Sequence, residues 1–139
     1  MYLFINTASN DKITVALAKA GFLSAISQPA RRRQSEKLLP AIAKLLKQNK
    51  TSFHPPAGGN LKGIIVASGP GSFTSLRIGI AVANTLGYCF NLPVVGVKEK
   101  ENSEEMIKEG IKKLKKIKKF KVVLPFYGGE PNITITNNR

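Results

Sequence analysis

Hydrophobic positions change their spacing along the chain, and each spacing predicts a different kind of element. Residues 2–5 form a short apolar run, and between residues 13 and 17 large apolar side chains alternate with polar or small ones, which is typical of strands. Residues 22–27 form a third segment of this kind, and only short polar links separate the three. We therefore expect three antiparallel strands in a meander at the start of the chain.

The middle of the chain alternates between helical and strand patterns. Apolar residues recur at helical spacing after Ser35, which we expect to cap a helix, and again from Ser75 to Asn91. The apolar run 63–67 matches a strand buried on both faces, and residues 93–97 are expected to form another short parallel strand. Because strand–helix–strand units require right-handed parallel crossovers, this order predicts a mixed sheet with helices on both faces. The expected fold class is α/β, with the ribonuclease-H-like (actin-like ATPase) architecture of three antiparallel strands followed by βαβα crossovers.

The segment from Lys98 to Lys121 combines ten lysines and five glutamates with an apolar stripe at helical spacing. The stripe consists of Ile107, Ile111, Leu114, Ile117 and Phe120. We expect an amphipathic helix packed on the core, followed by a last strand over residues 121–124. Its lysine face is either simply solvated or in contact with a polyanion such as RNA.

The length of 139 residues suits one domain. We assign residues 1–97 to the domain core, 98–124 to a helix and strand that complete it, and 125–139 to a tail. No apolar run approaches the ~20 residues that span a bilayer, and the first residues are too short for a signal peptide. We therefore expect a cytoplasmic protein without membrane contact, in which the lone Cys89 forms no internal disulfide.

The charge balance is strongly basic, with 22 Lys and Arg against 8 Asp and Glu and a net charge of +14. No carboxylate lies between Lys37 and Lys98, so the centre of the chain offers none for acid–base chemistry or metal binding. This distribution argues against an autonomous enzyme, and we expect no catalytic residues and no metal ligands. A basic RNA-binding module remains one alternative.

An autonomous ATPase or peptidase is the other alternative. An ATPase would depend on Asp11 or Glu36 for its metal. A peptidase would need Ser72 or Thr74 as nucleophile, with His54 in a remote loop as the base.

A glycine-rich turn, SGPGSFT at residues 68–74, follows the first buried strand and opens a helix. Glycine permits backbone conformations that other residues avoid, and the free N–H groups at a helix start favour an anion. The turn lacks the lysine of a phosphate-binding P-loop. Taken alone, it is either a tight turn with a capping serine or an anion site.

As a whole string the segment is more specific. Residues 68–97, SGPGSFTSLRIGIAVANTLGYCFNLPVVGV, closely resemble the GPGSFTGLRIG signature of the TsaB (YeaZ) family. Residues 3–8 with 13–17 resemble the first hairpin of that family, and residues 35–42, SEKLLPAI, resemble the start of its first helix. The three matches occur in the family's order and cover residues 1–97.

The resemblance implies an actin-like fold and a non-catalytic role in making N6-threonylcarbamoyladenosine (t6A) at position 37 of tRNA. It implies pairing with a TsaD-like catalytic subunit through helices of the first domain and a TsaE-like ATPase as a further partner. The sequence leaves open whether the chain forms a homodimer when it is alone. The expected contacts with the partner are Leu38, Leu39, Ile42, Thr74, Arg77, Ile78, Ala81 and Val82. The expected tRNA-facing residues are Lys112, Lys113, Lys115 and Lys116.

The resemblance implies no cofactor held by the chain itself, but allows ATP or ADP at the interface with the partner subunits. The candidate residues lie in two degenerate nucleotide turns and are Asn6, Thr7, Ser9, Gly71 and Ser72.

Three residues depart from the family pattern. Asn6 stands where the family usually has Asp, Gln34 where it has His, and Ser75 where it has Gly. Asn6 weakens any expectation of nucleotide hydrolysis, because the Asp serves metal and nucleotide in active actin-like ATPases. The family generally has a second actin-like half, so we expect a shortened form that lacks most of it.

Overall fold

The computed structural model describes residues 1–19, 22–53, 61–117 and 120–126, and it contains one five-stranded sheet in the order β3-β2-β1-β4-β5. The elements are β1 (Tyr2–Asn6), β2 (Lys12–Lys19), β3 (Phe22–Pro29), α1 (Gln34–Gln48), β4 (Gly63–Gly69), α2 (Phe73–Phe90), β5 (Val94–Lys98) and α3 (Ser103–Leu114). β1, β2 and β3 pair antiparallel, whereas β1–β4 and β4–β5 pair parallel. The predicted meander and crossovers are therefore confirmed.

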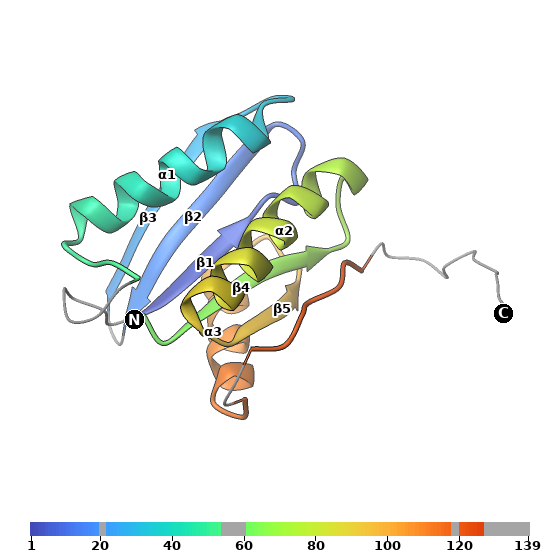
Figure 1. The fold of residues 1–139 in the computed structure, drawn as a ribbon. Helices are drawn as coiled ribbons and strands as arrows, with labels where there is room; N and C mark the ends of the chain where they lie inside the picture. The colour runs from blue at the N-terminus through green and yellow to red at the C-terminus, as the bar shows by residue number, and fades with distance from the viewer. Residues whose placement is uncertain (20–21, 54–60, 118–119, 127–139) are drawn as a thin grey trace, which may run out of the picture.

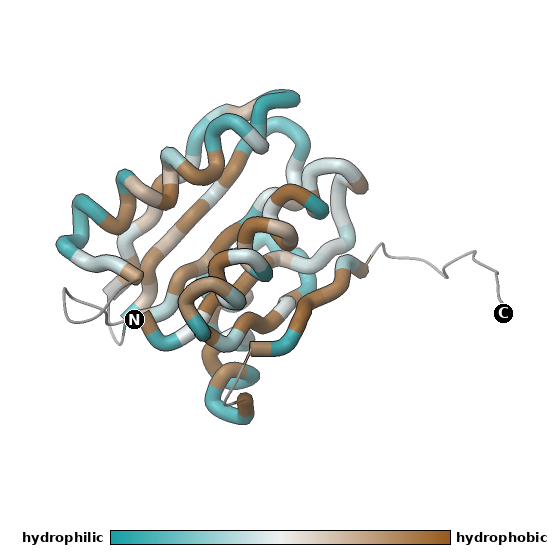
Figure 2. The backbone as a smooth tube through the Cα atoms, in the orientation of Figure 1, coloured by the Kyte–Doolittle hydropathy of each residue, from teal (hydrophilic) through white to brown (hydrophobic). Residues whose placement is uncertain are grey.

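The sheet separates two hydrophobic layers, with α1 and α2 on one face and α3 on the other (Figure 1). Side chains alternate between the faces along β1: Leu3 and Ile5 join the layer under α1 and α2, while Phe4 joins the layer under α3. Strand β4, between β1 and β5, is buried along its whole length. Figure 2 shows the same division, with apolar positions on the sheet and on the helix sides that face it.

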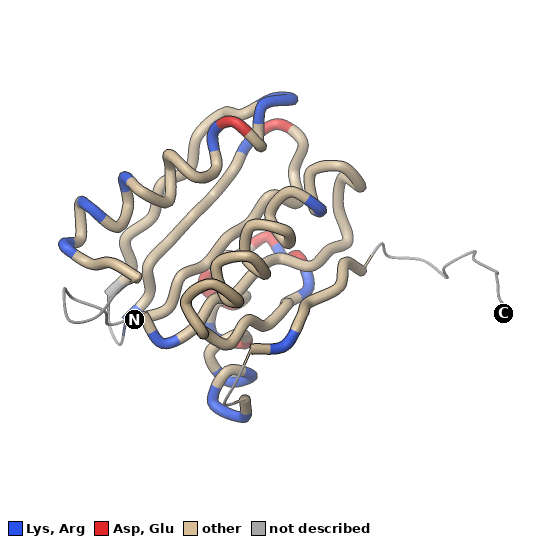
Figure 3. Tube along the Cα trace, viewed as in Figure 1, with Lys and Arg blue, Asp and Glu red and all other residues tan. Residues whose placement is uncertain are grey.

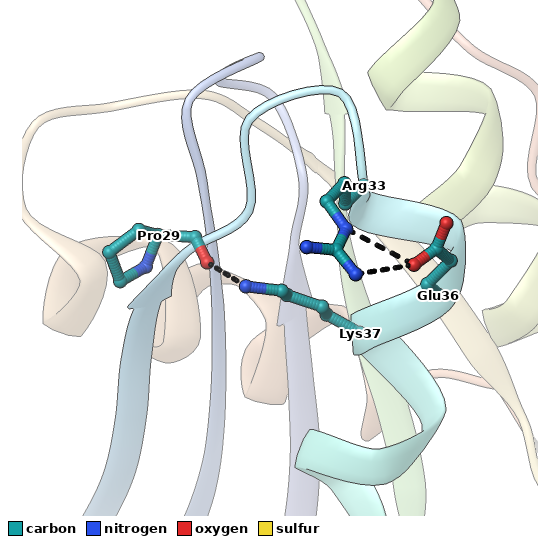
Figure 4. A network of polar contacts seen from close by, with 4 residues as sticks. All are labelled: Pro29, Arg33, Glu36 and Lys37. Atoms are coloured by element: carbon teal, nitrogen blue, oxygen red, sulfur yellow. Dashed lines mark hydrogen bonds and ion pairs between the residues drawn. The ribbon is translucent and has the colours of Figure 1, made fainter.

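Helix α1 begins one residue before the predicted cap. Arg33 rather than Ser35 is the N-cap residue, and no side-chain cap hydrogen bond forms there. Figure 4 shows two other links: the Arg33 guanidinium donates to Glu36 Oε2 at 3.1 Å, and Lys37 Nζ donates to the Pro29 carbonyl at 3.2 Å. Glu36 also lies in the first helical turn, where a negative charge suits the helix dipole.

The lysine-rich helix is shorter than predicted. α3 begins after Asn102, whose side chain accepts a hydrogen bond from the Glu104 N–H, and it ends at Leu114. Ile117 still packs in the layer under α3, but Phe120 packs on the opposite layer and meets the Tyr88 ring edge-on at 6.1 Å. The prediction that Phe120 shares the helical stripe is therefore wrong, because the chain has passed to the other face of the sheet by that point.

Residues 120–126 form an extended segment rather than the predicted strand over 121–124. Its bonds go to a helix side chain and a single strand carbonyl instead of a ladder. The Asn84 side chain accepts from the Val123 N–H and donates to the Val123 carbonyl, both at 3.0 Å, and the Phe126 N–H donates to the Ser68 carbonyl at 2.6 Å. The segment thus lies beside α2 and over the end of β4.

Candidate functional site

The two predicted nucleotide turns meet where β1 and β4 end. The Ser72 N–H donates to the Ala8 carbonyl at 2.9 Å, and a Cβ atom at Gly71 would overlap the Ala8 backbone. Gly69 has a φ of +119°, a conformation that L side chains rarely adopt, and the Phe126 carbonyl occupies the space of its missing side chain. Parallel strands thus bring the family's first hairpin and its glycine turn into direct contact.

Thr7 is completely buried and ties α2 to the sheet. Its hydroxyl donates to the Ser75 carbonyl at 2.6 Å and accepts from the Gly79 N–H at 3.2 Å. A Cβ atom at Gly79 would overlap this hydroxyl, so glycine is what allows the helix to approach the threonine. Thr7 therefore has a structural role in the described fold.

The other candidate nucleotide residues are also engaged within the chain. Asn6 Nδ2 donates to Glu99 Oε1 at 2.9 Å, while Asn6 Oδ1 accepts from the Ala8 N–H. Ser9 Oγ accepts from the Asp11 N–H at 3.1 Å. Ser72 is the N-cap residue of α2, but its side chain makes no cap hydrogen bond. The structure brings this set together, and the bonds it shows hold the turns rather than present them to a ligand.

Two departures from the family pattern contact each other. Gln34 and Ser75 are both 3% exposed, and Gln34 Nε2 donates to Ser75 Oγ at 3.0 Å and to the Ser9 carbonyl at 3.3 Å. This buried bridge links the start of α1 to the first turn of α2. The sequence analysis gave no contact between the two residues. The fact that both of them depart from the family pattern could have suggested it.

Helix α2 presents two different faces. The face on the sheet consists of Ser75, Leu76, Gly79, Ile80, Ala83 and Gly87. On the opposite side Thr74, Arg77 and Ala81 are exposed, and Ile78 and Val82 are half-buried. Phe73 and Tyr88 are 55% and 76% exposed at the two ends of the helix, and the Arg77 guanidinium lies 4.9 Å from the centre of the Phe73 ring. An accessible helix face with a small residue, Ala81, at its centre is therefore available.

Of the three candidate partner contacts on α1, two are buried and one is exposed. Leu38 and Ile42 are 0% and 2% exposed and form part of the core, because α1 lays this stripe on the sheet. Their assignment to a partner-facing surface is corrected. Leu39 is 53% exposed, one position around the helix from Leu38.

One of the four candidate tRNA-facing lysines is bonded within the fold. Lys113 Nζ donates to the Gly96 carbonyl at 2.8 Å and pairs with Glu109 at 3.4 Å, so Lys113 is tied to the fold. Lys112, Lys115 and Lys116 are exposed. Glu109 also pairs with Lys100 at 3.2 Å, and the hydrogen bond from Lys100, with the charges of both lysines, lowers the pKa of the Glu109 carboxyl.

The part of the chain that the structure describes lacks two further features, a membrane-spanning helix and a cluster of metal ligands. None of its helices has the length and apolar character needed to cross a membrane. Nor does any group of three or more His, Cys, Asp or Glu side chains gather there in a way that would hold a metal ion.

Comparisons of this chain with known proteins agree on one family. Residues 22–133 match the family model described as TsaD, tRNA N6-adenosine threonylcarbamoyltransferase. The "tRNA threonylcarbamoyladenosine biosynthesis protein TsaB" of Buchnera aphidicola (Acyrthosiphon pisum strain) is 30% identical over 90 residues, which cover 65% of this chain and 38% of the relative. The TsaB protein of Escherichia coli is 33% identical over 95 residues, covering 68% and 38%.

Other matches reach the enzyme itself and a solved structure. A tRNA N6-adenosine threonylcarbamoyltransferase of Listeria monocytogenes is 36% identical over 76 residues, covering 55% of this chain and 21% of the enzyme. The structure of YeaZ from Pseudomonas aeruginosa superposes with a TM-score of 0.63 and 28% identity, covering 70% of this chain and 43% of that one. The chain thus spans well under half the length of these relatives. With the family model matched over most of its residues, the chain belongs to the TsaD family, and its fold is that of the YeaZ-like, actin-like domain.

Proposed function

We propose that this chain is a TsaB-like subunit, without catalysis of its own, that docks on a TsaD-like enzyme during t6A synthesis in tRNA. Relatives named as t6A biosynthesis proteins support the pathway, and the YeaZ structure supports the same domain. We include a TsaE-like ATPase as a further member of the assembly and tRNA as its substrate.

The observation that carries the proposal is the two-faced helix α2. One face is sealed against the sheet, while Thr74, Arg77 and Ala81 on the other stay exposed. The small side chain of Ala81 lets a second helix approach the centre of this face, and exposed aromatic rings such as Phe73 and Tyr88 are typical anchors of protein interfaces. The same face would pair two copies of the chain when no enzyme is present.

The two turns between β1 and α2 support an activator rather than an enzyme. Asn6 and Thr7 use their polar groups on Glu99, Ser75 and Gly79. The residues that a nucleotide would need are thus engaged in holding the fold, so this geometry gives no support for ATP or ADP held by this chain alone. Any nucleotide at the interface depends on the partner subunits.

The proposal is tested by placing a large charge at the centre of the exposed α2 face. Ala81→Arg should weaken co-purification with a TsaD-like enzyme at least tenfold, because the longer side chain blocks close helix packing. The matched control is Ala25→Arg, the same change at an exposed position on the edge strand β3, which should leave the complex intact. Circular dichroism should show both variants folded.

Reconstitution provides the functional measurement. Modification of tRNA by the TsaD-like and TsaE-like partners should require this chain and should fall with Ala81→Arg but not with Ala25→Arg. If Ala81→Arg binds and supports modification like the unmodified chain, α2 is not the docking surface.

A further inference from the structure

Two lysines flank the start of β1, one at the end of β2 and one just before β4. In the sheet register Tyr2 stands opposite Ala18 on β2 and opposite Gly63 on β4. The preceding position, Met1, is therefore flanked by Lys19 on one side and Lys62 on the other, and the Lys62 N–H donates to the Met1 carbonyl at 2.7 Å. Both lysines are exposed.

The end of α3 arrives at the same place on the other face of the sheet. The Leu114 side chain occupies the space beside Gly63 at the start of β4, and Tyr2 and Ile117 pack in the same hydrophobic layer as Leu114. Lys115 and Lys116 lie between those two apolar anchors and are exposed. Figure 3 shows basic positions, drawn in blue, in the loop before β4 and at the end of α3.

The described carboxylates lie in other parts of the fold. Asp11 and Glu36 are at the opposite end of the sheet, in the turn before β2 and the first turn of α1. The others follow β5 or belong to α3: Glu99, Glu101, Glu104, Glu105 and Glu109. Glu109, the member nearest the end of α3, is already paired with Lys100 and Lys113.

The two sheet-end lysines also act on Met1. Partial burial is the largest cause that lowers the pKa of its amino group, and the positive charges of Lys62 and Lys19 lower this pKa further. The contribution of the two lysines indicates a positive potential at this end of the sheet, which attracts anions.

We propose that Lys19, Lys62, Lys115 and Lys116 form a composite surface, the lysine platform, that binds the sugar-phosphate backbone of RNA. The platform includes two lysines from the sheet that the lysine-rich helix alone does not supply, and it leaves out Lys113. The choice of RNA among polyanions rests on the proposed function. Lysine ammonium groups bind phosphates as point charges, so binding is salt-dependent and insensitive to base sequence.

The test is titration of fluorescently labelled tRNA with the full chain over a series of salt concentrations, read by fluorescence anisotropy. Lys19→Gln/Lys62→Gln should weaken binding about tenfold at low salt and reduce the slope of log affinity against log salt by about 1.5, because two phosphate contacts are lost. The control Lys12→Gln/Lys44→Gln removes the same charge from exposed positions elsewhere and should change affinity less than about twofold. Lys115→Gln/Lys116→Gln should reproduce the loss independently of the sheet.

Equal losses in both sheet and control variants would overturn the platform, since only net charge would then matter. Binding to phosphatidylserine vesicles without binding to tRNA would also overturn it, in favour of a membrane surface. The result is separable from the docking proposal: Ala81→Arg should bind tRNA normally, and Lys19→Gln/Lys62→Gln should still co-purify with the enzyme.

Discussion

The hydroxyl of Thr7 is used to hold the fold together, although the polar turn that contains it was a candidate ligand site. Its hydroxyl lies between β1 and α2 with no exposure to solvent, and it bonds both Ser75 and Gly79. A buried hydroxyl that both donates and accepts has no capacity left for a phosphate. The position therefore fixes the glycine turn and α2 relative to the first strand.

Replacing Thr7 by the nearly isosteric valine should lower the free energy of unfolding by about 1 kcal/mol, because a buried hydrogen-bonding hydroxyl is lost without a change in volume. The urea midpoint measures this effect. Thr14→Val is the matched control: its hydroxyl contacts Ser27 Oγ at an exposed site, so its change should stay within about 0.5 kcal/mol. A Thr7→Val midpoint equal to that of the unmodified chain would contradict the structural role.

The Gln34–Ser75 bridge marks the limit of prediction at this scale. The motif located Ser75 after the glycine turn and Gln34 beside the start of the first helix, one residue before the expected cap, because local patterns fix local structure. Their contact joins positions 41 residues apart and is created only by the packing of α1 on α2. No spacing along the chain encodes such a pair, whereas a comparison of the departures as a set would have suggested it.

At the scale of elements, α3 is organised by charge as well as by its apolar stripe. Glu104 and Glu105 lie in its first turn and Lys112 and Lys113 in its last, an arrangement that suits the helix dipole. Glu109 at its middle links Lys113 on the helix to Lys100 in the chain before it. These pairs are exposed, so each contributes only modestly to stability.

The pH dependence of α3 should follow Glu109. Because the folded chain lowers the pKa of this carboxyl, its contribution is fully present above the unfolded pKa, about 4.3, and is lost as pH falls through the folded value. Glu109→Gln should therefore be less stable than the unmodified chain by at most about 1 kcal/mol at neutral pH, and the difference should vanish in acid. Urea midpoints at a series of pH values measure it. A difference that grows on acidification would contradict the assignment.

Element types followed from periodicity as far as Leu114, but the end of the lysine-rich helix and the strand expected over 121–124 did not. The stripe continued through Ile117 to Phe120 at helical spacing, and no Gly or Pro follows Gly110 within it, so the pattern indicated one long helix. The chain instead leaves the helix at Leu114, since Phe120 packs half-buried on the opposite hydrophobic layer, beside Tyr88. A tertiary contact thus overrides the local preference for helix.

On the scale of the whole molecule, the two ends of the sheet differ in character. The strand ends after β1 and β4 hold two interlocked turns, and the strand starts hold the proposed lysine platform. The exposed face of α2 lies between them, along the sheet (Figure 1). Docking to an enzyme and contact with RNA would therefore use separate surfaces, which is why their variants should behave independently.

The extended segment 120–126 completes this architecture by covering the sheet beside α2. The Asn84 side chain hydrogen-bonds the Val123 backbone through both its amide oxygen and its amide nitrogen, and the Phe126 N–H donates to the Ser68 carbonyl. Because no strand ladder supports the segment, we expect the Asn84 side chain to contribute much of what keeps the segment in place.

Asn84→Ala should therefore raise the hydrogen-exchange rate of the Val123 amide about tenfold or more, equivalent to about 1.4 kcal/mol of local stability, while the exchange rates of amides within β4 stay unchanged. Thr85→Ala, at the neighbouring exposed position on α2, serves as control and should leave the Val123 amide unchanged. Unaltered Val123 exchange in Asn84→Ala would mean that packing of Phe120 and Val123 on the core, rather than the Asn84 hydrogen bonds, holds the segment against α2.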